Sequence, residues 1–150
     1  MGNRAVKALG EIERSTLYLP TFILEPCYTT ADVEATVADF WRRWHDFQKK
    51  CRWECVLIGL HYAFCAEIDY LTVEDICACP QKLQTLEDLG WDSQSDKPVF
   101  VPHIHGWIAV NNTKLLQQRL KEFQVNVKGE RNWRHDGEKG IGRRRHCFPS

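Results

Sequence analysis

The chain has 150 residues, with 20 basic and 20 acidic side chains and 43% apolar residues, which is the composition of a single folded domain. This balance argues against a disordered chain and against a membrane span. A chain of this length buries roughly two-thirds of its unfolded surface, so its core does not depend on disulfides or on a structural metal.

The N-terminal residues 1–20 carry charges and lack an apolar stretch of signal-peptide length. The seven cysteines are an odd number, and without a secretory signal they are expected to be reduced thiols. We therefore expect a cytoplasmic protein with no membrane partner.

Three elements are predicted in the first half of the chain. Residues 17–24 are apolar and β-prone, and Pro20 favours an edge position or a bulge in this strand. Residues 31–50 place apolar side chains at helical spacing after the capping residues Thr29 and Thr30. Residues 53–70 are rich in β-branched and aromatic residues and predict a long strand. Its odd positions share one face: Cys55, Leu57, His61, Ala63, Cys65, Glu67 and Asp69.

The second half begins with an acidic insertion at residues 71–97, which contains a short helix near 81–89 ended by Gly90. Residues 99–110 predict the next strand. Asn112 and Thr113 then cap a helix that runs to about residue 123, and residues 125–127 predict a short closing strand.

The order of these elements is β-α-β-β-α-β. This order predicts an α+β, ferredoxin-like (split βαβ) fold, in which one antiparallel sheet is backed by two helices. We expect residues 1–127 to form this domain and residues 128–150 to form a basic C-terminal tail.

Charge is distributed unevenly along the chain. Residues 67–96 hold eight acids and one base, a net charge of −7, whereas residues 97–150 hold eleven bases and four acids, a net charge of +7. The basic half offers a surface for a polyanion such as single-stranded DNA. The side chains that we expect to contact DNA are Arg131, Arg134, Arg143, Arg144, Arg145 and, by stacking on bases, Trp107.

Two histidines in the predicted strand at 99–110 form the clearest chemical motif. His103 and His105 are separated by one residue, so both side chains point to the same face, with Cα atoms roughly 6 to 7 Å apart. The preceding strand supplies His61, Glu67 and Asp69 with one shared parity, so an antiparallel pairing would place one of these acids beside the histidine pair. Two imidazoles and a carboxylate can bind Mg²⁺, Mn²⁺ or Zn²⁺ and leave positions open for a phosphate oxygen.

The segment PHIHGWIAV at 102–110 resembles the His-hydrophobic-His motif of HUH endonucleases, in particular the rolling-circle replication initiators of plasmids and viruses. The similarity in element order extends over residues 17–127. It implies a divalent-metal-dependent enzyme that nicks and transfers single-stranded DNA through a tyrosine nucleophile, in the cytoplasm of a host whose replication machinery it would work with. The resemblance also implies a third metal ligand from the same sheet face, for which Glu67 is the first candidate by position, with Asp69 and His61 behind it.

The chain departs from the initiator pattern in the position of its tyrosines. Initiators carry the nucleophile on a helix after the histidine strand, whereas all four tyrosines here, Tyr18, Tyr28, Tyr62 and Tyr70, precede His103. Relaxase-type relatives carry it near the N-terminus, which makes Tyr28 the candidate by order. Alternatively, the tyrosine helix lies beyond Ser150 in a longer protein, or the chain has kept metal and DNA binding and lost the covalent chemistry.

Two other functions compete with the nickase. One is a zinc-stabilised binding module in which Cys77 and Cys79 join His103 and His105 as four ligands, although Cys-x-Cys is a poorer chelating spacing than Cys-x-x-Cys. The other is a catalytically silent ferredoxin-like protein that binds nucleic acid, with strong salt dependence and no metal requirement.

Overall fold

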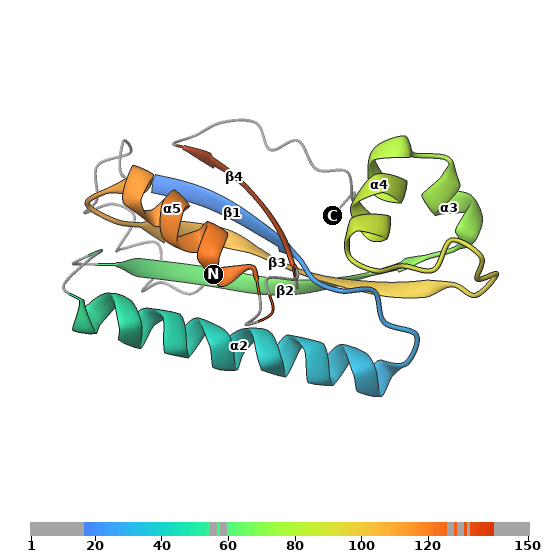
Figure 1. Cartoon of the computed structure of the whole chain (residues 1–150), viewed down its shortest axis with the longest axis horizontal. Helices are drawn as coiled ribbons and strands as arrows, with labels where there is room; N and C mark the ends of the chain where they lie inside the picture. Colours follow the sequence, from blue (N-terminus) through green and yellow to red (C-terminus); the bar gives the residue numbers. More distant parts are fainter. Residues whose placement is uncertain are drawn as a thin grey trace.

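A computed structural model describes residues 17–54, 57, 60–125, 128, 131 and 133–139 of the chain. Its elements, in chain order, are β1 (Leu17–Ile23), α2 (Thr30–Trp53), β2 (His61–Leu71), α3 (Val73–Cys77), α4 (Pro80–Asp88), β3 (Val99–Ala109), α5 (Thr113–Phe123) and β4 (Arg134–Lys139). The strands form one sheet in the order β2-β3-β1-β4, and all neighbours are antiparallel (Figure 1). This confirms the predicted α+β, split βαβ architecture.

Helix α2 begins where its capping residues predict. The hydroxyl of Thr29 accepts a hydrogen bond from the backbone N–H of Asp32 at 3.1 Å. The helix continues to Trp53, because Cys51 extends the buried stripe by one more turn. The strand expected from residue 53 therefore starts only at His61, which corrects that boundary.

No helix in the described part of the chain is long and apolar enough to cross a membrane.

The main core lies between the sheet and the helices α2 and α5. We call this side of the sheet the back face, and it carries the even-numbered residues of β1 and β3, such as Phe22 and Ile104. Figure 1 shows α2 running along one side of the sheet. Asn112 caps α5 as predicted by accepting a hydrogen bond from the N–H of Leu115 at 3.0 Å. Burial of this apolar surface is the main source of stability of the fold.

The acidic insertion folds against the opposite side of the sheet, which we call the front face. It contains α4, as expected, and also α3, which was not predicted. Thr72 and Asp75 form a capping box that starts α3. Helices α3 and α4 cover one end of the front face (Figure 1), where they pack on odd-numbered strand residues. These strand residues are Ile23, Leu71, Val99 and Val101.

The fourth strand differs from the prediction. Val125 forms only an isolated bridge with Arg131, residues 126 and 127 lie outside the described residues, and the closing strand is β4. Part of the expected basic tail thus belongs to the sheet. The segment RHDGEK lacks β-branched residues, so its propensity gives no strand signal; pairing with β1 decides its conformation. Gly137 suits this pairing because a Cβ there would overlap the Tyr18 ring.

Candidate metal centre

The pairing of β2 with β3 brings the predicted ligands together on the front face. Glu67 lies directly opposite His103, and Cys65 lies directly opposite His105. Side chains opposite each other in an antiparallel pair have Cβ atoms about 4.5 to 5.5 Å apart, so all four residues share one small area. Gly106 allows this close pairing, because a Cβ at that position would overlap the backbone carbonyl of Ala63.

The carboxylate of Glu67 lies between the two imidazoles. Its Oε2 is 3.2 Å from Nε2 of His103, and its Oε1 is 3.0 Å from Nε2 of His105. Desolvation raises the pKa of Glu67, but the contacts with His105 and then His103 outweigh it, so the pKa lies below its ordinary value of 4.5. Glu67 is therefore an anion at neutral pH, which is the form that binds a cation.

The two runner-up ligands lie in different places. Asp69 is close to the centre, with its Oδ2 3.8 Å from Nδ1 of His103. His61 pairs with Ala109, four residues beyond His105 on β3, which is roughly 13 Å along the strand. The structure thus brings Asp69 to the histidine pair and leaves His61 outside it.

A compact group of metal-ligand atoms among the described residues includes Cys65, which the sequence analysis did not choose as a ligand. One ligand atom each from Cys65, Glu67 and His105 lies within 4.8 Å of the other two, whereas His103 is outside this group. Thiolate, carboxylate and imidazole suit a borderline divalent ion such as Zn²⁺, so the donor chemistry fits a metal. The odd position of Cys65, which it shares with Glu67, is the signal in the sequence that marks its face.

Trp107 does not have the exposure that stacking on DNA bases requires. It lies on the same face as the histidines but is only 4% exposed, and it packs in a small cluster with Leu17 and Ala109. Its ring is therefore not presented for stacking in this structure, and its contact with DNA stays a prediction. The polar side chains of Cys65, Glu67, Asp69, His103 and His105 thus lie between two apolar clusters of the front face, and we call this polar area the front-face window.

The tyrosines are divided by strand parity. Tyr18, Tyr62 and Tyr70 occupy even positions of β1 and β2, so they lie on the back face. His103 and His105 lie on the opposite, front face. Tyr18 and Tyr62 pack with the back-face core, and Tyr70 packs on Phe100 with ring centroids 5.1 Å apart.

Tyr28 is not held in a strand, so strand parity does not restrict it. Its side chain is 41% exposed and it precedes α2. The neighbouring Cys27 forms a bridge with Phe100, which is three residues before His103 on β3, or roughly 10 Å along the strand.

The two described arginines of the predicted DNA-binding set contact the acidic insertion. Arg134 donates a hydrogen bond to the Thr85 hydroxyl at 3.2 Å, and Arg131 lies 3.9 Å from the carboxylate of Asp88. Opposite charges of the two halves of the sequence thus meet within the molecule. The other three arginines, at 143–145, lie outside the described residues.

The four-ligand zinc site does not form in the structure. Cys77 ends α3 and Cys79 precedes α4, and the described group of neighbouring ligand atoms contains neither of them. The described cysteines form no disulfide with one another.

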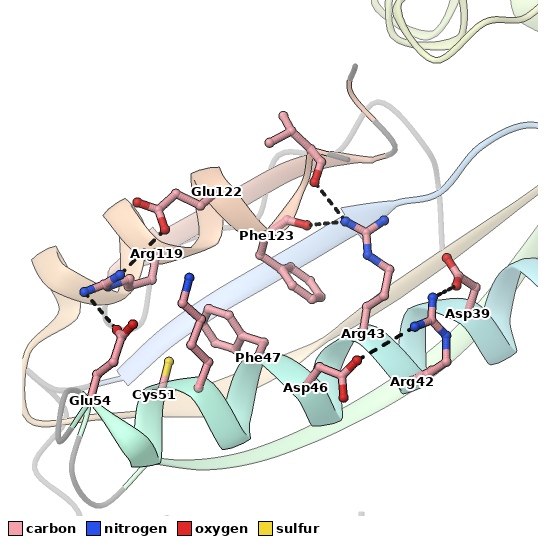
Figure 2. Close-up of a pocket in the computed structure, with 12 residues that line it drawn as sticks. Asp39, Arg42, Arg43, Asp46, Phe47, Cys51, Glu54, Arg119, Glu122 and Phe123 are labelled. Atoms are coloured by element: carbon pink, nitrogen blue, oxygen red, sulfur yellow. Dashed lines mark hydrogen bonds and ion pairs between the residues drawn. The ribbon is translucent and has the colours of Figure 1, made fainter. Parts of the chain in front are cut away.

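A pocket of about 680 Å³ is lined by residues of α2 and α5 (Figure 2). Neither His103 nor His105 is among its lining residues. Its charged groups largely neutralise one another: Arg119 lies 3.2 Å from Glu54 and 3.7 Å from Glu122. Arg43 donates to the backbone carbonyls of Phe123 and Val125, each at 3.0 Å. These contacts tie the two helices together, so we assign the pocket a role in stability.

Comparison of the chain with protein-family models, with curated proteins and with solved structures gives no significant match. The function must therefore be argued from the fold and from the chemistry of the front-face window.

Proposed function

We propose that this protein is a metal-dependent endonuclease that nicks and transfers single-stranded DNA, as in the initiation of rolling-circle replication. The observation that carries the proposal is the contact of the Glu67 carboxylate with both His103 and His105 on the front face of a split βαβ sheet. The resemblance of residues 102–110 to the HUH motif supplies the reaction class.

The residues that would hold the divalent ion are Glu67, His103 and His105. When bound, such an ion neutralises charge on the scissile phosphate and makes its phosphorus more electrophilic. The anionic Glu67 provides the negative charge of the site, and Asp69 adds a second carboxylate behind His103.

Tyr28 is the proposed nucleophile. Its phenolic oxygen would form a bond to the phosphorus while the bond from phosphorus to the 3′ oxygen breaks, and the proton would pass to that leaving oxygen. The products are a 5′-phosphotyrosine link and a free 3′-hydroxyl. The exposure of Tyr28 and its place in a connecting segment, rather than in a strand, support this choice over the other tyrosines.

Single-stranded DNA would approach through its phosphates. The basic residues at 143–145 are the proposed backbone contacts, because Arg131 and Arg134 already face partners on α4. Replacement of Arg143, Arg144 and Arg145 by alanine should lower the slope of log affinity against log salt by about 2 to 3.

Formation of a covalent adduct tests the enzyme proposal. A 3′-labelled, random-sequence library of single-stranded oligonucleotides, incubated with the protein and Mn²⁺, should produce a labelled protein band on a denaturing gel. Tyr28→Phe and Glu67→Ala should abolish the band, whereas Tyr70→Phe, the matched control on β2, should retain it. A band that persists in Tyr28→Phe contradicts the assignment of the nucleophile.

The catalytically silent DNA-binding protein is the second candidate, and the back-face position of three tyrosines favours it. This function predicts salt-dependent binding of single-stranded DNA with no adduct and no loss of affinity in EDTA. That combination of results would replace the enzyme proposal.

A further inference from the structure

The thiol of Cys65 lies in the front-face window. Cys65 and His105 form a directly opposed pair of β2 and β3, and Glu67 occupies the next position of the same face on β2. The ligand atoms of these three residues lie within 4.8 Å of one another. Cys65 is exposed and forms no disulfide, so its sulfur is accessible to an ion from solvent.

The spacing of these atoms is close to that of a tetrahedral zinc site. Zinc binds sulfur at about 2.3 Å and nitrogen or oxygen at about 2.0 to 2.2 Å, so neighbouring ligand atoms in a tetrahedron are about 3.3 to 3.8 Å apart. Glu67 Oε1 already lies 3.0 Å from His105 Nε2, and the ligand atoms of all three residues lie within 4.8 Å of one another. Side-chain rotation of Cys65 and Glu67 on the edge strand β2 can bring the sulfur into this range.

His103 has a different environment from the other three residues. It is 3% exposed, its Nε2 contacts Glu67, and its Nδ1 faces Asp69 at 3.8 Å. A buried imidazole that contacts two carboxylates fixes the orientation of the carboxylate that binds the metal. The burial of His103 and its absence from the compact group therefore fit a positioning residue.

We propose that the centre is a thiolate-containing site for a Zn²⁺-class ion, with Cys65, Glu67 and His105 as ligands and His103 as the residue that positions Glu67. This inference rests on the metal centre of the proposed function and changes its ligand set. Three protein ligands leave a fourth position for water or a phosphate oxygen, which is the arrangement of catalytic zinc sites. A thiolate also disfavours Mg²⁺, which prefers oxygen ligands.

Cobalt substitution tests the thiolate ligand directly. Titration of the 150-residue chain with Co²⁺ should produce the near-ultraviolet charge-transfer absorption of a cobalt–thiolate bond, with a stoichiometry of one. Cys65→Ser should abolish this absorption, and Cys77→Ser, the matched control at another exposed cysteine, should retain it. One equivalent of Zn²⁺ should displace Co²⁺, whereas a large excess of Mg²⁺ should not.

The role of His103 is tested in the same experiment. His105→Ala should abolish the absorption, because it removes a ligand. His103→Ala should keep the absorption but weaken Co²⁺ binding by about 10- to 100-fold, as expected for a group that orients a ligand. Recovery of most of this affinity in His103→Gln, whose amide can donate to Glu67, would separate positioning from packing.

Several results would overturn the inference. They are Co²⁺ binding without charge-transfer absorption, equal affinity in wild type and Cys65→Ser, loss of the absorption in Cys77→Ser, and absence of Co²⁺ binding. The first two leave the proposed nickase intact, because Glu67 and the histidines could still hold Mn²⁺. Failure of the nickase is seen separately, as the absence of a DNA adduct with either Zn²⁺ or Mn²⁺.

Discussion

The two faces of the sheet differ in what their side chains do. The back face is covered by α2 and α5 and holds an aromatic core, in which Phe40 and Trp44 stack with ring centroids 6.5 Å apart. The front face holds two smaller apolar clusters with acidic, histidine and thiol side chains between them. Because side chains alternate along a strand, one sheet can be stabilised on one face and carry chemistry on the other.

The largest effect is expected from loss of Trp44, which is fully buried in the back-face core. Trp44→Ala should lower the free energy of unfolding by about 3 to 5 kcal/mol, because it leaves a cavity among packed rings. Urea denaturation followed by circular dichroism measures this change. Trp53→Ala is the control on the same helix, since Trp53 is 87% exposed, and it should change stability by less than about 0.5 kcal/mol.

A smaller loss is expected at Arg43, which joins α2 to the end of α5. Its guanidinium donates to two carbonyls and lies 4.0 Å from the centre of the Trp133 ring. Arg43→Ala should lower the free energy of unfolding by about 1 to 3 kcal/mol, because partly buried acceptors lose their donor. Chemical denaturation measures this loss, and Arg42→Ala, at the exposed neighbouring position, should change the free energy of unfolding little. Equal effects of the two variants would mean that surface charge, not the helix contact, matters.

The capping box of α3, on the front face, should make the stability of the protein depend on pH. Asp75 accepts hydrogen bonds from the N–H and hydroxyl of Thr72, and these hold its pKa below the ordinary value of 3.8. A lowered pKa adds stability above the unfolded-state pKa, and this stability is lost as the pH falls through the folded-state pKa. Asp75→Asn should therefore destabilise the protein at neutral pH and match wild type in strong acid.

Thermal denaturation at several pH values measures the effect at Asp75. Glu74→Gln is the control, because this neighbouring acid of α3 lies outside the capping box. A constant difference in melting temperature between wild type and Asp75→Asn at all pH values would contradict the role of the ionised carboxylate.

The smallest effect on stability is expected from Cys65→Ala, within the front-face window. The side chain is exposed, so the free energy of unfolding of the metal-free protein should change by less than about 0.5 kcal/mol. Denaturation in EDTA tests this expectation. A loss above about 1 kcal/mol would mean that Cys65 contributes to packing, and the separation between a stabilising and a chemical face would not hold at this position.

The sequence was enough to predict the fold class and to place His103 and His105 on one face of the sheet. Helical spacing at 31–50 and the cap at Asn112 are local signals, so they predicted α2 and α5 closely. The period of two in strands placed His103 and His105 on one side, and on the strand before it grouped Glu67 with Asp69 and His61 on one face. These inferences need only the geometry of the local backbone.

The tertiary structure decided what depends on contacts between distant segments. Strand β4 exists because the edge of β1 offers it a partner, and the polar segment itself gives no strand signal. Trp107 is buried because apolar neighbours from β1 and β2 surround it, although its parity would equally suit exposure. The register of β2 on β3 places Cys65 opposite His105. Strand parity defines a side chain's face, whereas its neighbours depend on how the strands pair.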